Sequence, residues 1–132
     1  GNLTMASADK SGILKIQRAL KNSELVGMLP DQDPGVEGGI ITPFFNTKAN
    51  TMTLLAKVAR KNDLQVLIFW AKRLPRGGGY ELNLEPVDLN TNGDTLEGQV
   101  ASMNQCVEAL IRKMPEQYMW SYKRFKSTHS YG

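Results

Sequence analysis

The sequence has little of the two residue types on which much metal and nucleophile chemistry depends. It holds one cysteine, Cys106, and one histidine, His129, in 132 residues. A single cysteine excludes an internal disulfide, so a disulfide-stapled secreted scaffold is excluded. A single histidine excludes a metal site built on several histidines. No apolar run approaches the roughly 20 residues of a membrane-spanning helix, and no secretory signal peptide is visible.

The composition is that of an ordinary folded domain. Hydrophobic residues make up 41% and charged residues 22% of the sequence, which excludes disordered, collagen-like and low-complexity classes. The length suits one domain with a hydrophobic core. The net charge of +3 and the pI near 9.1 favour an anionic partner.

Apolar spacing and turn residues predict that helices alternate with strands. Helices are predicted from an N-cap at Asp9 or Ser11 to about residue 21, from an N-cap at Thr47 to about residue 62, and over about residues 95–114. Short apolar runs predict strands over residues 3–6, 25–29, 39–42, 64–70 and 80–85, with turns at 43–46 and 75–79. This alternation indicates an α/β fold, with a mixed sheet and flanking helices in a single domain over residues 1–132.

Two of these strands carry predictions about burial. The run 25–29 is continuously apolar, which is typical of a strand buried on both faces. The run 80–85 alternates, which predicts that Tyr80, Leu82 and Leu84 face the core. Residues beyond about position 126 are expected to be loose, because chain ends without anchoring contacts fray.

Three polar residues follow the predicted strand over 25–29: Asp31, Gln32 and Asp33. Ligands of open α/β sheets bind at the carboxyl ends of strands. Two carboxylates at such a position can accept hydrogen bonds from a sugar, and one of them can bind a divalent ion. The alternative is a turn in which Asp33 ties down the backbone around Pro34.

A second charged cluster lies near the C-terminus, where cations are interleaved with aromatic side chains. Its members are Arg112, Lys113, Lys123, Arg124 and Lys126 with Tyr118, Trp120, Tyr122 and Phe125. Such a block suits a phosphorylated ligand, an anionic membrane surface or nucleic acid. Nucleic acid is the weakest of these, because the net charge is small and no nucleic-acid motif is present. The alternative is a solvated face whose aromatic side chains pack on the core.

The remaining reactive residues do not form a catalytic arrangement. His129 lies in the expected loose tail, where it has no orienting partner. Cys106 lies between apolar positions of the third predicted helix with no base to activate it, so a packing role is expected. The glycines at 77–79 lack the ending of a phosphate-binding loop and fit a hairpin turn.

Several motifs occur together in an order and spacing that resemble a known family. They are residues 29–33 (Leu-Pro-Asp-Gln-Asp), 38–39 (Gly-Gly), 43–45 (Pro-Phe-Phe), 79–82 (Gly-Tyr-Glu-Leu), 115–120 (Pro-Glu-Gln-Tyr-Met-Trp) and 123–126 (Lys-Arg-Phe-Lys), together with Thr51 and Arg73. From about Leu3 to Lys126, the chain resembles the lipid A biosynthesis lauroyl/myristoyl acyltransferase family of Gram-negative bacteria.

The resemblance implies an enzyme at the cytoplasmic face of the inner membrane, with part of a glycerolipid-acyltransferase-like fold and no cofactor or metal. Such enzymes transfer a fatty acyl chain from acyl carrier protein to a hydroxyl of a phosphorylated glucosamine disaccharide, the precursor of lipid A. By analogy with the acceptor-contacting Phe-Pro-Glu-Gly block of the wider group, Asp31 faces the acceptor, with Gln32 and Asp33 beside it. Arg124 and Lys126 are expected to contact an anionic glycolipid or headgroup.

Two features depart from the family pattern. Asn46 replaces the glycine that ends the Pro-Phe-Phe-Gly turn, which is a mild change because asparagine tolerates the left-handed conformation. More seriously, the sequence has no histidine followed five residues later by Asp or Glu, the family's catalytic signature. The resemblance therefore assigns no catalytic residue to this chain. It implies the C-terminal portion of a longer enzyme, without its N-terminal membrane helix.

We expect such a portion to be soluble, inactive alone and prone to self-association. Two alternatives stay open. One is a non-catalytic module that binds lipid or acyl carrier protein. The other is an acyltransferase that acts on a different phosphoglycolipid.

Overall fold

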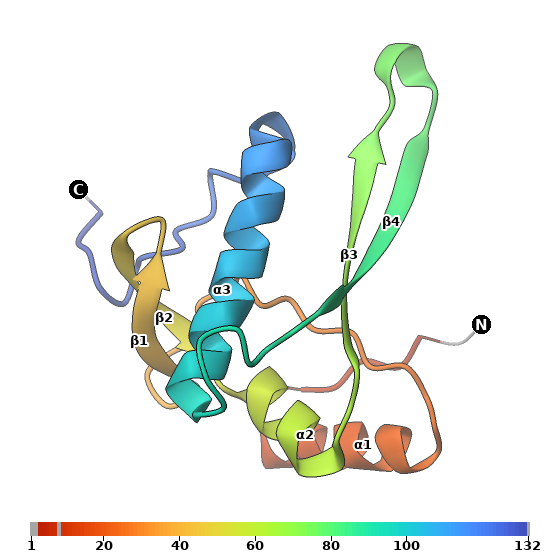
Figure 1. Cartoon of the computed structure of the whole chain (residues 1–132), viewed down its shortest axis with the longest axis vertical. Helices are drawn as coiled ribbons and strands as arrows, with labels where there is room; N and C mark the ends of the chain where they lie inside the picture. Colours follow the sequence, from red (N-terminus) through yellow and green to blue (C-terminus); the bar gives the residue numbers. More distant parts are fainter. Residues whose placement is uncertain (1–2, 8, 132) are drawn as a thin grey trace.

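The computed structural model describes residues 3–7 and 9–131. Figure 1 shows three helices and two separate antiparallel hairpins in the described part of the chain. The helices are α1 (Lys10–Lys21), α2 (Leu54–Asn62) and α3 (Leu96–Lys113), and the strands are β1 (Gly39–Phe44), β2 (Thr47–Met52), β3 (Val66–Arg73) and β4 (Tyr80–Val87). Short 3-10 turns lie at Pro75–Gly77 and Pro115–Gln117. The predicted α/β class is confirmed.

Helices α1 and α3 form where the apolar spacing predicts them. The side chain of Asp9 caps α1 by accepting a hydrogen bond from the Gly12 backbone N–H at 2.9 Å. This bond, with those from Ser11 and Ser7, lowers the pKa of Asp9 to about 2. The Thr95 hydroxyl caps α3 in the same way.

The β1–β2 hairpin turns at Phe45 and Asn46, within the predicted turn. Their φ angles of 50° and 59° are those of the tight two-residue turns whose twist matches antiparallel strands. The helix predicted from residue 47 is wrong in its first part, because Thr47–Met52 pairs with β1 instead. The remaining part is the helix α2, which begins after Thr53.

The β3–β4 hairpin forms as predicted, with pairs that run from Val66–Val87 to Arg73–Tyr80. Its tip projects beyond the other elements (Figure 1). The predicted burial is wrong, since Tyr80, Leu82 and Leu84 are 66%, 64% and 58% exposed. A two-stranded sheet has two faces, and no described element covers the one that carries these side chains.

Two predicted strands do not form. Residues 3–6 and 25–29 lie outside every described strand, and Leu25 and Leu29 are 93% and 60% exposed. A strand buried on both faces needs neighbours along its edges and layers above and below. The described residues provide neither for 25–29, so the apolar run stays irregular.

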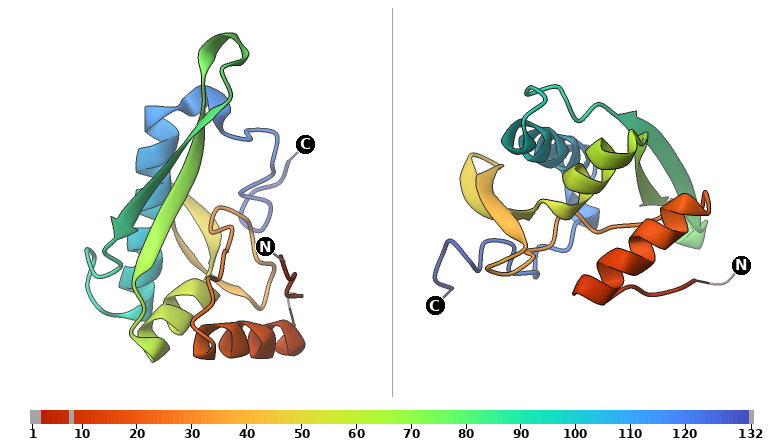
Figure 2. Two further views of the ribbon diagram at one scale, coloured as in Figure 1. Left: turned by 90° about the vertical axis from the view of Figure 1, so that its right-hand side faces the viewer. Right: turned by 90° about the horizontal axis from the view of Figure 1, so that it is seen from below.

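The core lies on two sides of α3. One cluster joins α2 to α3, and its members are Ala56, Ala59, Leu89, Val100 and Met103. The other joins the β1–β2 hairpin to α3, and its members are Phe44, Ala49, Val107 and Ile111. Seen from below in Figure 2, α3 lies between the two hairpins. No helix within 3–7 and 9–131 is long and apolar enough to cross a membrane.

Candidate functional site

The acidic loop (Asp31, Gln32 and Asp33) is held against the C-terminal tail (residues 118–131). Asp31 is half-buried and Gln32 is exposed, whereas Asp33 is only 8% exposed. The backbone N–H of Asp33 donates a hydrogen bond to the Tyr122 hydroxyl at 2.8 Å. These residues are 89 positions apart, so the position of the loop depends on the tail.

The Asp33 carboxylate fixes the turn that follows it. Its Oδ1 accepts hydrogen bonds from the Gly35 backbone N–H at 2.9 Å and from Asn50 Nδ2 at 3.1 Å. Burial raises the pKa of Asp33, but the nearby Ser127 side chain, the hydrogen bonds from Gly35 and Asn50 and the charge of Lys126 outweigh it and leave the pKa below its usual value. The turn interaction foreseen from the sequence is therefore present. Within the described chain, the buried Oδ2 has no hydrogen-bond partner.

Gly39 lets this turn approach β2 closely. A Cβ at this position would meet Asn50 Oδ1, and would lie 2.7 Å from Pro34 Cγ and 2.8 Å from the Thr51 carbonyl oxygen. Any larger residue would push the turn away from Asn50, which binds Asp33. The close packing of Asn50, Pro34 and Thr51 therefore leaves room only for glycine at position 39.

Arg124 is buried beneath the tail, with 2% of its surface exposed. Its Nη1 donates to the Asn50 carbonyl at 2.6 Å and its Nη2 donates to Thr51 Oγ1 at 2.8 Å. Its guanidinium lies 5.0 Å from the centre of the Phe44 ring. Burial lowers the pKa of Arg124. The side chain thus ties the tail to β2.

These contacts form one connected set, which we call the polar network. Its members are Asp33, Asn50, Thr51, Tyr122 and Arg124. Asn104 joins it to α3, because its Nδ2 donates to Thr51 Oγ1 at 3.1 Å and to the Pro43 carbonyl at 2.8 Å. Buried polar groups that are hydrogen-bonded together specify one arrangement of their elements. The network sets the position of the acidic loop relative to the tail.

The structure brings four of the five predicted site residues together. The positive charge of Lys126 acts on Asp33, and the negative charges of Asp33 and Asp31 act on Arg124. Gln32 is the exception, because its side chain is exposed and makes no described hydrogen bond. The ligand-binding roles of all five residues stay predictions.

An apolar groove of about 590 Å³ runs beside the acidic loop. Its lining comes from the end of α1, the segment 25–29, α2, β3 and α3, and includes Leu20, Val26, Leu55, Val66, Met103 and Leu110. Asp31 and Tyr118 contribute polar groups to the lining. Burial, and then the charge of Asp31, raise the pKa of Tyr118 to about 12, so its hydroxyl stays protonated at neutral pH.

The residues around this site do not favour a cysteine nucleophile, a histidine base or a metal ion. Burial and the charges of Glu85 and Asp88 raise the pKa of the Cys106 thiol, which disfavours the reactive thiolate. His129 is exposed in the tail, beside the Thr128 hydroxyl and the Phe125 ring. The described residues contain no group of three or more His, Cys, Asp or Glu side chains that could hold a metal ion.

Sequence reasoning missed Asn50, a member of the polar network, and Asn104, which joins the network to α3. Asn50 was assigned to a helix, where its partners across the hairpin could not be inferred. The available signal was Asn46, because asparagine tolerates the left-handed conformation that a two-residue hairpin turn requires. Residues beyond about position 126 were also expected to be loose, but the Thr128 hydroxyl donates to the Lys48 carbonyl at 2.6 Å, which anchors this part of the tail.

Comparison with known proteins places this arrangement in a family. Residues 2–127 match the family model of the bacterial lipid A biosynthesis acyltransferase. The chain is 35% identical over 120 residues to the lipid A biosynthesis lauroyltransferase of Escherichia coli (strain K12), and 33% identical over 124 residues to the lipid A biosynthesis palmitoleoyltransferase of the same strain. It is 29% identical over 113 residues to a lipid A biosynthesis acyltransferase of Haemophilus influenzae.

These alignments cover 90%, 92% and 86% of this chain. They cover only 39%, 40% and 35% of the relatives, so the chain spans about two fifths of their length. The family model nevertheless matches nearly the whole chain, as the resemblance of its motifs predicts. The chain belongs to the bacterial lipid A biosynthesis acyltransferase family.

Proposed function

We propose that this chain is the acceptor-side part of a lipid A acyltransferase that works at the cytoplasmic face of the inner membrane. The donor is a fatty acyl chain on acyl carrier protein. The acceptor is a hydroxyl of a phosphorylated glucosamine disaccharide. Two relatives named lauroyltransferase and palmitoleoyltransferase of lipid A biosynthesis support this assignment.

The apolar groove is the observation that carries the proposal. Its volume of about 590 Å³ lies within the range of small-molecule sites, roughly 300–1,000 Å³. Its lining is predominantly apolar, which suits a fatty acyl chain. The acidic loop supplies a polar boundary through Asp31, and Tyr118 supplies a hydroxyl that stays protonated.

The transfer forms one ester bond and breaks one thioester bond. The acceptor hydroxyl oxygen attacks the thioester carbonyl carbon, and the carbon–sulfur bond then breaks. The carrier thiolate leaves and takes up the proton that a base removed from the hydroxyl. Asp31 would orient the acceptor by accepting a hydrogen bond from a sugar hydroxyl.

We infer that the 132 residues do not supply the base, because their single histidine, His129, is exposed in the tail. We therefore propose that the chain alone does not transfer acyl groups. Incubation with lauroyl-acyl carrier protein and the disaccharide precursor should give no acylated product by mass spectrometry, whereas product formation would overturn this part of the proposal.

The two tryptophans allow a direct test of the groove. Trp70 lines the apolar groove and Trp120 lies outside its lining. A Trp120→Phe variant therefore reports on the groove alone, and a Trp70→Phe variant is its matched control. Brominated lauric acid should quench Trp70 saturably and Trp120 much less. Equal quenching of the two tryptophans, or none, would contradict an acyl-binding groove.

A further inference from the structure

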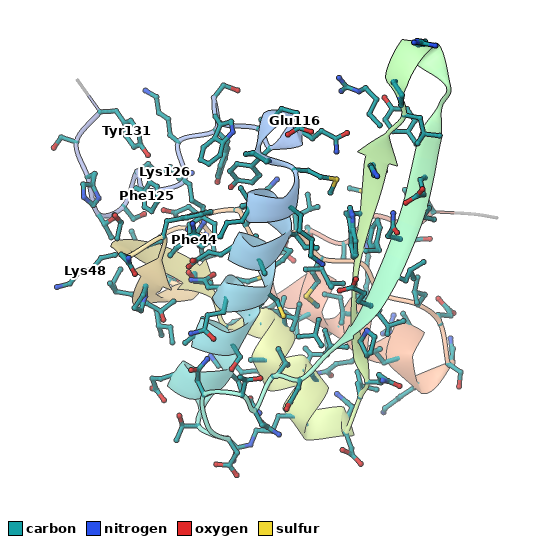
Figure 3. All side chains as sticks on the ribbon, turned by 45° about the horizontal axis from the view of Figure 1, so that its top comes forward. Phe44, Lys48, Glu116, Phe125, Lys126 and Tyr131 are labelled. Atoms are coloured by element: carbon teal, nitrogen blue, oxygen red, sulfur yellow. The ribbon has the colours of Figure 1, made fainter. Side chains whose placement is uncertain are left out.

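A second pocket is lined by the β1–β2 hairpin and the C-terminal tail, and it shares Tyr118 with the apolar groove. It has a volume of about 450 Å³, and its lining includes Phe44, Phe45, Trp120, Phe125 and Tyr131, with Arg124 as its one charged residue. We call it the aromatic pocket. Figure 3 shows Phe44, Phe125, Lys126 and Tyr131 gathered at the β1–β2 hairpin, on the side that faces away from the β3–β4 hairpin.

The aromatic pocket contains a buried positive charge without a direct counter-ion. Arg124 is 2% exposed, and it takes part in no ion pair among residues 3–7 and 9–131. Its Nε is buried and has no hydrogen-bond acceptor in that part of the chain. A buried charge is costly unless it is paired. The carboxylates of Asp31 and Asp33 act on the guanidinium only at longer range. An anion in the pocket would supply the missing charge.

Two further cations stand at the rim of the aromatic pocket. The Lys123 ammonium lies 5.5 Å from the centre of the Tyr131 ring, and the Lys126 ammonium lies 6.0 Å from the centre of the Tyr122 ring. Neither lysine forms an ion pair in the described chain. Both side chains are exposed and can therefore turn toward an anionic ligand.

The remaining surface of the pocket suits the face of a ring. Phe45 packs edge-on against Phe44 with 5.0 Å between ring centres, and it lies 6.3 Å from Trp120. Trp120 is fixed by a hydrogen bond from Nε1 to the Pro115 carbonyl at 2.7 Å, although 61% of its surface is exposed. Rigid aromatic faces bind the apolar side of a ring, and a few charged groups fix its orientation.

We infer that the aromatic pocket binds a phosphorylated amino sugar ring. The ring would pack on Trp120 and Phe45, and its phosphate would lie near Lys123 and Lys126 above the buried charge of Arg124. This inference rests on the proposed function, because it assigns a place to one sugar of the acceptor. It assigns the sugar and the acyl chain to two different pockets, whose linings meet at Tyr118.

The test uses the full chain with Trp70→Phe, in which Trp120 is the only fluorophore of its kind. Glucosamine 1-phosphate should change the Trp120 emission saturably. Glucosamine and inorganic phosphate should each bind at least about 5-fold more weakly, because each retains only one of the two kinds of contact. Uridine monophosphate, which combines a phosphate with a different ring, tests the preference for the amino sugar.

Variants at the rim separate this site from general attraction to a basic protein. Lys123→Gln with Lys126→Gln should weaken glucosamine 1-phosphate binding about 5- to 10-fold. The control, Lys10→Gln with Lys15→Gln on the exposed face of α1, removes the same charge and should have no effect. Arg124 is left unchanged because the fold depends on it.

Three results would overturn the inference: equal binding of inorganic phosphate, equal binding of uridine monophosphate, or equal loss in the α1 control. Absence of glucosamine 1-phosphate binding would overturn it as well. If brominated lauric acid still quenches Trp70 in that case, the proposed function stands and only the sugar site falls. If neither probe binds, both fall.

Discussion

The two hairpins of this chain have the same topology but opposite environments. In the β1–β2 hairpin, Ala49, Asn50 and Thr51 are 0%, 4% and 0% exposed, because α3 and the C-terminal tail cover them. In the β3–β4 hairpin, Phe69 and Leu84 lie opposite each other and are 60% and 58% exposed. An isolated two-stranded hairpin is at best marginally stable, so each must be stabilised from outside.

The difference separates a half that buries its polar groups within the described structure from a half with an exposed apolar face. The β1–β2 hairpin satisfies its buried polar groups through the polar network. One face of the β3–β4 hairpin contacts α3. There the Lys113 Nζ lies 3.7 Å from Glu85 Oε1 and 5.5 Å from the centre of the Trp70 ring. The other face of this hairpin exposes Phe69, Leu82 and Leu84, an apolar surface of the kind that marks an interaction site, and Phe69 and Leu84 also line the apolar groove.

The largest loss of stability is expected when Arg124, which ties the tail to the β1–β2 hairpin, is removed. Arg124→Met should lower the free energy of unfolding by about 3 kcal/mol, because two charged hydrogen bonds are lost and the Asn50 carbonyl is left without this donor. Urea denaturation followed by circular dichroism measures this loss. Arg18→Met on the exposed face of α1 is the control, and equal losses in the two variants would contradict the role of the network.

A smaller loss is expected from Gly39→Ala. The added methyl group meets Asn50, Pro34 and Thr51, so overpacking should lower the free energy of unfolding by about 2 kcal/mol. Gly27→Ala has open space around it and should change stability little. Similar urea midpoints for the two alanine variants would show that the turn can move away from β2 at no cost.

The third prediction concerns acid. The pKa of Asp33 is below its usual value, so its carboxylate stabilises the fold above the unfolded-state pKa, about 3.9. That stabilisation is lost as the pH falls through the folded-state pKa. The urea midpoint of the parent chain should therefore fall more steeply below about pH 4 than that of Asp33→Asn. Asp9 contributes to both curves, so parallel curves would exclude a role for Asp33.

The smallest effect on stability is expected for a substitution on the exposed face of the β3–β4 hairpin. Leu82 is 64% exposed and lies outside the apolar groove, so Leu82→Lys should change the free energy of unfolding by less than about 0.5 kcal/mol. The same change should reduce self-association of the chain in sedimentation experiments, because a charge is placed on the apolar surface. Leu14→Lys on α1 is the matched control. A monomeric parent chain at high concentration would refute the proposed self-association.

Local patterns predicted the elements whose stabilising partners lie nearby in sequence. Side-chain spacing predicted the apolar face of α3, and turn chemistry predicted the N-cap at Asp9 and the pairing of β3 with β4. They also led to the acidic loop and to Arg124. The family's motifs supplied the expected function, which periodicity alone did not.

The errors occurred where distant contacts decide the structure. The segment Thr47–Met52 has helix-compatible spacing, but it forms β2 because Arg124 and Asn104 bind it from far along the chain. The run 25–29 is apolar enough for a buried strand, but no described element pairs with it. The burial of a segment depends on which other elements pack against it, and the pattern of the segment itself does not predict those elements.

The separation of the network's partners also affects the order of folding. Arg124 binds residues 73 and 74 positions away, whereas the β1–β2 turn closes over two residues. Loop closure costs more entropy as the loop lengthens, so the hairpin can form before Arg124 docks. Contacts made after the transition state slow unfolding and leave the folding rate nearly unchanged. If the Arg124 contacts form after the transition state, we expect Arg124→Met to speed unfolding and to leave the folding rate nearly unchanged, so that the acidic loop is held in place for a shorter time.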